Sequence, residues 1–149
     1  MTPKPPKPNV AVATFCEKVL EDKDGVHSVI RIIDNVTVVI NPLLERHRGE
    51  PAVNVHFFVM LRAGPARGEY PLAFILRLPD GDTRQVGRAT VSFAGEDQGV
   101  TLTGELVLRS RAIDEGQHWL DVVVDDEKLA TIPLRLRVQQ AQSSSPNLS

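Results

Sequence analysis

Residues 115–138 alternate between apolar and polar side chains with the two-residue period of a β-strand. Four alternate positions of the first half share the apolar face: His118, Leu120, Val122 and Val124. The polar run at 125–128 (DDEK) predicts a turn, after which the alternation resumes. The segment therefore predicts a β-hairpin with one face in a core. Because a hairpin alone is at best marginally stable, the rest of the chain must supply a second sheet.

Further segments with strand chemistry recur along the chain, separated by turns rich in Gly, Pro and Asp. They cover residues 10–17, 26–33, 53–62, 69–78, 84–93 and 100–109. Residues 35–40 either continue the second of these strands or begin another. Gly104 falls at an inward position and indicates a bulge or a close crossing. About eight short strands without a convincing helix predict an all-β, antiparallel β-sandwich of immunoglobulin-like or C2-like type, with a closed barrel as the alternative.

The length of 149 residues suits one domain. Residues 1–9 are rich in proline and predict a flexible arm, and the polar tail at 139–149 predicts disorder. The single domain then covers residues 10–138. The stretch at 41–52 breaks the strand pattern and predicts a loop or crossover.

Charge and cysteine content exclude several classes of function. The net charge of −2 argues against nucleic-acid or anionic-membrane partners. The chain has one cysteine, so it cannot form an internal disulfide. No stretch approaches the roughly 20 apolar residues that span a bilayer. Together these features predict a cytoplasmic protein.

Three stretches resemble a family of short bacterial proteins of unknown function, whose members are solitary immunoglobulin-like sandwiches. They are ATFCEKVLEDKDGVHSVIRIIDNV, GEYPLAFILRLPDG and EGQHWLDVVVDDEKLATIPLRL, and the resemblance covers most of residues 10–138. Cys16-Glu17 matches a Cys-acid pair that ends the first strand in this family. His118 departs from the pattern, because an aromatic residue usually stands there. The resemblance implies a fold but no activity.

The sequence assigns no catalytic residue, metal ligand or cofactor. Cys16 could act as a nucleophile with a histidine of a neighbouring strand, such as His56 or His118, but a small buried apolar role is favoured. The four histidines, which include His27 and His47, lack metal-ligand spacing. Individually satisfied histidines are therefore the favoured interpretation, and the chain is predicted not to be an enzyme.

Aspartates at the predicted turns allow a calcium or small-ligand site as an alternative function. They are Asp22, Asp24, Asp80, Asp82, Asp125 and Asp126. Calcium takes oxygen ligands, and C2-type sandwiches gather aspartates at one end. The run Asp22–Gly25 lacks the full ligand series, and Asp-Gly is first of all a turn signal.

Trp119, Asp121, Val123 and Asp125 are predicted on the face opposite the core, as a mixed apolar and acidic strip. Such a strip suits a protein interface, unless a loop or the N-terminal arm covers the tryptophan. The predicted function is a non-enzymatic module that binds another protein, or itself, through a sheet face or edge. A calcium or small-ligand domain ranks second, and a Cys16-dependent enzyme third.

Overall fold

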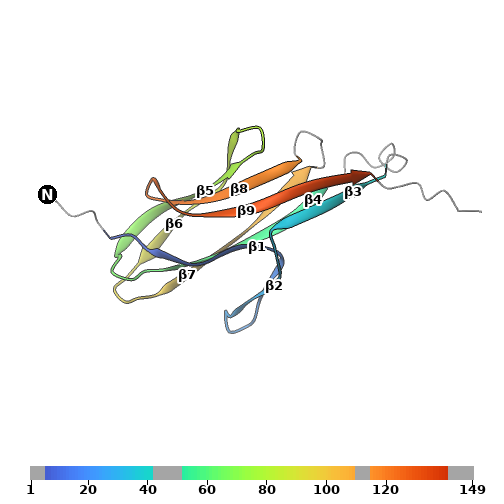
Figure 1. Cartoon of the computed structure of the whole chain (residues 1–149). Helices are drawn as coiled ribbons and strands as arrows, with labels where there is room; N and C mark the ends of the chain where they lie inside the picture. Colours follow the sequence, from blue (N-terminus) through green and yellow to red (C-terminus); the bar gives the residue numbers. More distant parts are fainter. Residues whose placement is uncertain (1–5, 42–51, 110–114, 141–149) are drawn as a thin grey trace, which may run out of the picture.

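The computed structural model describes residues 6–41, 52–109 and 115–140, which form nine β-strands and no helix (Figure 1). The strands are β1 Asn9–Glu21, β2 His27–Ile33, β3 Asn35–Ile40, β4 Ala52–Arg62, β5 Gly68–Arg77, β6 Thr83–Phe93, β7 Gly99–Arg109, β8 Gly116–Val124 and β9 Glu127–Gln140. Every strand predicted from the sequence is present, within a few residues at each end.

The strands form two sheets packed face to face, as an immunoglobulin-like sandwich. Sheet A has the order β2-β1-β4-β7, and sheet B has the order β3-β9-β8-β5-β6. Neither sheet closes on the other, so the closed-barrel alternative is wrong. The pair β3–β9 is parallel, whereas all other pairs are antiparallel, so the prediction of a purely antiparallel sandwich needs this correction.

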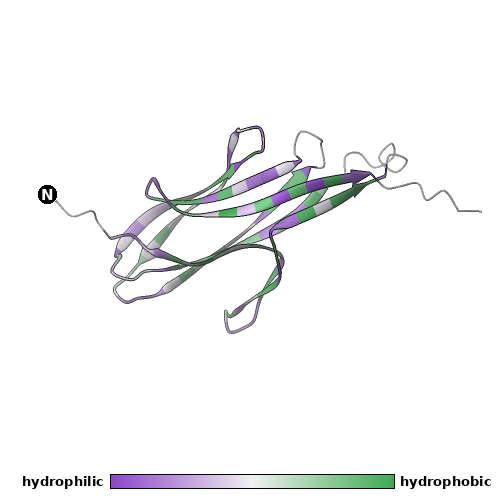
Figure 2. Ribbon diagram, in the orientation of Figure 1, coloured by the Kyte–Doolittle hydropathy of each residue, from purple (hydrophilic) through white to green (hydrophobic). Residues whose placement is uncertain are grey.

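The core consists of alternate side chains from the two facing sheets, as the period of two predicts (Figure 2). In β8, Leu120, Val122 and Val124 are fully buried. Burying such a side chain contributes roughly 1.5–3 kcal/mol. The inward face predicted for residues 118–124 is therefore confirmed.

Residues 27–40 form two strands rather than one, which raises the strand number from about eight to nine. β2 pairs with β1 in sheet A, whereas β3 pairs with β9 in sheet B. Asp34 lies at the crossing between the sheets, and its carbonyl oxygen accepts a hydrogen bond from the Arg135 amide at 2.9 Å. This bond starts the β3–β9 pairing next to the crossing.

β1 and β2 form a ribbon that leaves the body of the sandwich (Figure 1). Pairing between β1 and β4 stops at Cys16 and His56, after which β1 pairs with β2 alone. Arg31 in this ribbon has a φ of 53°, in the left-handed region that non-glycine residues rarely adopt. On the ribbon, the His27 ring packs against the Phe58 ring at a centroid distance of 5.7 Å.

Parts of the two ends that the sequence predicts to be flexible are attached to the sandwich. From Pro6 onward the arm is attached, since Tyr70 donates a hydrogen bond to the Pro6 carbonyl at 2.9 Å. The Lys7 ammonium pairs with Glu127 at 2.7 Å, and Pro8 is buried. At the other end β9 continues to Gln140. Residues 1–5, 42–51 and 141–149 lie outside the described residues, and with them most of the predicted 41–52 loop.

Candidate functional site

Trp119, Asp121 and Val123 lie on the outer face of sheet B, opposite the core, as predicted. Asp125 follows them in the β8–β9 turn, where it and Asp126 adopt positive φ angles of 49° and 63°. The three strand residues are not freely exposed, because Asp121 retains only 4% of its accessible surface. The acidic character expected of this strip is therefore largely hidden.

Asp121 is held by three side chains from neighbouring strands. Arg77 of β5 donates two hydrogen bonds to its carboxylate, from Nε at 2.9 Å and from Nη2 at 3.1 Å. The Thr131 hydroxyl of β9 donates a third at 2.7 Å and accepts one from Arg77 Nη2 at 3.2 Å. The Lys128 ammonium lies 3.4 Å from the carboxylate.

Two opposing effects act on the pKa of Asp121. Burial raises this pKa, whereas the hydrogen bonds from Thr131 and Arg77 and the charges of Arg77 and Lys128 lower it. The lowering effects prevail, so the pKa lies below its ordinary value and the carboxylate stays ionised at neutral pH. The cluster is therefore a satisfied, charge-assisted network on the surface of the sheet.

Trp119 is half-buried and lies beside this network. The Arg77 guanidinium stands over its ring, 5.7 Å from the centroid, in cation–π geometry. Across the strand pair, Trp119 faces Pro133 of β9. Among the described residues, Arg77 covers part of the tryptophan. The sequence placed Arg77 in a strand, but gave no signal that it would reach a residue 44 positions away.

Cations dominate the outer face around Trp119. The strand register puts five of them there: Arg77, Arg88, Lys128, Arg135 and Arg137. Within the five strands only two acids, Asp121 and Glu69, share this face. Five cations against two acids leave a charge of +3 on the strands of this face, although the whole chain carries −2. Asp34 and Asp126, which line depressions at its ends, reduce this charge to +1. We call this surface the Trp119 face.

Two shallow depressions flank the middle of the Trp119 face. One lies between β6, β5 and the end of β8, with Ala73, Arg88 and Val123 in its lining, and has a volume of about 490 Å³. The other, of about 400 Å³, includes Asp34, Pro133, Arg135 and Arg137 in its lining. Trp119 and Asp121 lie between them along β8. The face thus combines two depressions, charged side chains and an aromatic ring, which are features of a protein-binding surface.

Cys16 does come to lie opposite a histidine, because His56 is its cross-strand neighbour. The thiol is nonetheless fully buried. Burial raises the pKa of Cys16, and a backbone hydrogen bond from Lys18 offsets only part of this effect. A protonated and inaccessible thiol is a poor nucleophile, so the geometry favours the small buried apolar role.

The other histidines occupy two different places. His27 and His56 line a cavity of about 300 Å³ between the β1–β2 ribbon and sheet A, together with Glu21 and Glu105. His118 lies on the core side of sheet B, fully buried. Within residues 6–41, 52–109 and 115–140, no three His, Cys, Asp or Glu side chains are placed to hold a metal ion. His47 lies outside the described residues.

The turn aspartates do not gather at one rim. The 78–82 turn lies beyond the Arg77–Trp119 end of the β5–β8 pair, whereas Asp125 and Asp126 lie beyond the opposite, Leu72–Val124 end. In the 78–82 turn, the Asp82 amide donates a hydrogen bond to Asp80 Oδ1 at 2.9 Å, so this carboxylate already serves the turn. The calcium alternative therefore lacks the convergence of oxygen ligands that it requires.

Comparisons with known proteins assign the chain to no family. No protein-family profile and no curated protein sequence matches the chain. Among solved structures, an immunoglobulin-like protein of Pseudomonas aeruginosa is 14% identical, with 91% of this chain and 100% of that chain covered and a TM-score of 0.38. A CARDB domain of a Pyrococcus furiosus protein, in complex with di-metal ions, is 15% identical, with coverages of 93% and 94% and a TM-score of 0.44.

A third similar structure is the Pseudomonas fluorescens alkylpurine DNA glycosylase AlkC bound to DNA containing an abasic site analog. The two are 20% identical, the match covers 66% of this chain, and the TM-score is 0.44. This chain spans only 27% of the glycosylase, and 15% of each of two similar β-glucosidases. These similarities concern the sandwich fold alone.

Within the described residues, no helix is long and apolar enough to cross a bilayer.

Proposed function

We propose that this chain is a non-enzymatic interaction module that binds an acidic segment of another protein through the Trp119 face. The observation that carries the proposal is the charge of this face. Five cations share the outer face of sheet B with the single tryptophan of a chain whose net charge is −2, and one of them, Arg77, lies over its ring. Such a concentration of one sign of charge steers oppositely charged partners and selects among them.

The Arg77–Asp121–Thr131 network prepares the surface for binding. It fixes the guanidinium over the Trp119 ring before a partner arrives, so less side-chain freedom is lost on association. Trp and Arg are also the residues that contribute most often to binding energy at interfaces. The central contact therefore combines an ordered aromatic ring with satisfied polar neighbours.

The spacing of the two depressions suggests an extended partner segment. Residues 117 and 123 of β8 reach the two depressions, and six residues of strand span about 20 Å. A stretch of roughly six extended residues would cross the face, with acidic side chains toward Arg88 at one end and toward Arg135 and Arg137 at the other.

Fluorescence offers a direct test, because Trp119 is the only tryptophan and reports on its own surroundings. A glutamate-rich peptide should change its emission in a saturable manner that weakens with salt. Oligolysine of equal length should leave it unchanged. The double variant R135Q/R137Q should bind the acidic peptide more weakly, whereas Lys18→Gln, at an exposed position of β1 in sheet A, should bind it as the parent does.

Two outcomes would contradict the proposal. The first is an emission that responds equally to both peptides, or to neither. The second is a single-stranded oligonucleotide that displaces the acidic peptide at lower concentration than any peptide competitor, because that would identify the face as a nucleic-acid surface.

A further inference from the structure

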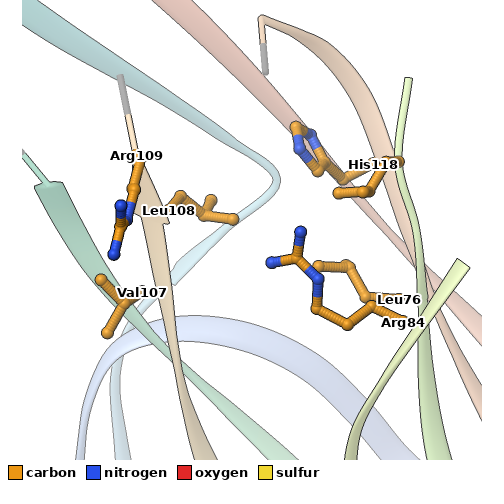
Figure 3. A pocket seen from close by; sticks show the side chains of 7 residues that line it. Leu76, Arg84, Val107, Leu108, Arg109 and His118 are labelled. Carbon is orange, nitrogen blue, oxygen red and sulfur yellow. The ribbon is translucent and has the colours of Figure 1, made fainter. Parts of the chain in front are cut away.

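A second basic feature lies on the other side of sheet B, in a cavity between the two sheets. The cavity has a volume of about 250 Å³. It opens where β6 and β7, the edge strands of their sheets, run past each other. Leu76, Leu78, Arg84, Val107, Leu108, Arg109 and His118 line it (Figure 3).

Arg84 is the unusual residue of this cavity. It is the cross-strand partner of Leu76, which is 3% exposed, but Arg84 itself is exposed near the start of the edge strand β6. In Figure 3 its guanidinium extends into the space between Leu108 and His118. A permanent charge therefore lies at the opening of the cavity, beside apolar side chains of the core.

The described lining of the cavity carries positive charge. Among the described residues, no acidic residue lines it. Within the same residues, the side chains of Arg84 and Arg109 have no hydrogen-bond or ion-pair partner. Five donors of a guanidinium in a partly enclosed space favour an oxyanion, because planar carboxylates and phosphates can accept two of them at once.

His118 supplies a polar wall to the same cavity. It is fully buried, and its Nδ1 lies 3.2 Å from the Gly116 carbonyl oxygen, to which the ring N–H donates. This bond sets the orientation of the ring, so the polar wall has a defined shape. Leu76 and Leu108 supply apolar walls to the same cavity.

We propose that this cavity is a binding site for a small oxyanion, either a carboxylate or a phosphate group, with Arg84 as the direct ligand and Arg109 as a charge at the mouth. The site is separate from the Trp119 face. Arg84 and Arg88 lie four residues apart on β6 but point to opposite faces of sheet B, since their cross-strand partners are the buried Leu76 and the outward Ala73. The two proposals can therefore fail independently.

The test is an NMR titration of the full chain at low ionic strength with sodium phosphate, sodium acetate or sodium chloride. Phosphate or acetate should shift the amide signals of Leu108 and His118 along a saturation curve, and chloride at equal ionic strength should not. Saturation by phosphate alone identifies a phosphate site, and saturation by acetate alone a carboxylate site. Either result supports the proposal.

Variants then assign the binding group. Arg84→Gln should lower the affinity for the anion roughly tenfold or more, because it removes charged hydrogen bonds. Arg84→Lys should retain part of the affinity as a point charge, and it remains informative if the glutamine variant does not fold. Arg109→Gln should weaken binding by a smaller factor, and Arg88→Gln should leave it unchanged. Shifts that never saturate, or an Arg84→Lys variant that binds as tightly as the parent, would overturn the proposal.

Discussion

Asp121 is the residue on which the geometry of the Trp119 face most depends. Asp121→Asn keeps the shape of the side chain but removes the charge that Arg77 and Thr131 contact at 2.7–3.1 Å. We expect a loss of about 1–3 kcal/mol in the free energy of unfolding at neutral pH, the usual contribution of hydrogen bonds to charged groups. Urea denaturation measures this loss, and the control Asp126→Asn, in the exposed turn, should change stability little.

The same substitution has a predictable pH dependence. The pKa of Asp121 is lower in the folded protein than in the unfolded chain, where it is about 3.9. Its contribution is therefore fully present above the unfolded pKa and is lost as the pH falls through the folded pKa. The stability difference between parent and Asp121→Asn should persist from pH 7 to pH 5 and shrink below about pH 4. A difference that is constant down to pH 2 would contradict this assignment.

At the scale of single residues, the sequence predicted which face of the sheet a side chain points to better than it predicted which residues that side chain contacts. The alternation in β8 correctly put His118 inward and Trp119 and Asp121 outward. It could not predict that Asp121 would be nearly buried, because this depends on Arg77, 44 positions away, and on a pairing of β5 with β8 that local patterns do not encode. The inward Arg84 was missed for the same reason.

Between strands, the packing of β4 against β7 depends on Gly104. The β4–β7 pairing runs without a register shift, so Gly104 marks a close approach rather than a bulge. A Cβ at this position would overlap the Phe57 ring, which is 3% exposed and packs against Phe74 at 4.7 Å. The ring has little room to move away.

Gly104→Ala should therefore lower the free energy of unfolding by about 1–3 kcal/mol through overpacking. Gly99→Ala in the same strand is the matched control, since its Cβ would lie 3.7 Å from the Leu61 carbonyl oxygen, an ordinary contact. Chemical denaturation of both variants tests the claim. Equal stabilities would show that Phe57 can yield and that the glycine is not required.

The crossing at Asp34 shows what local patterns cannot determine about strands. Residues 26–40 have nearly continuous strand chemistry, and nothing local indicates that the chain changes sheets within them. The change depends on the Arg135 amide, about a hundred residues later, which bonds to Asp34 and starts the parallel pairing with β9. Strand positions were therefore predictable, whereas the sheet membership of β3 was not.

For the molecule as a whole, net charge was a misleading guide to partners. A value of −2 indicates no preference, yet the strands of one face of sheet B carry five cations against two acids. Outward positions on five strands must be known together before this surface can be recognised. The alternation placed Trp119, Arg135 and Arg137 at outward positions, but it could not show that Arg77 and Arg88 of other strands share their face.

The measurement that tests the central claim most directly is chemical-shift mapping with the glutamate-rich peptide on isotope-labelled protein. We expect the perturbed backbone amides to cluster in β5, β8 and β9 around Trp119, and the perturbations to diminish in the R135Q/R137Q variant and with added salt. Perturbations centred on the β1–β2 ribbon or on the Arg84 cavity, or none at saturating peptide, would contradict the account.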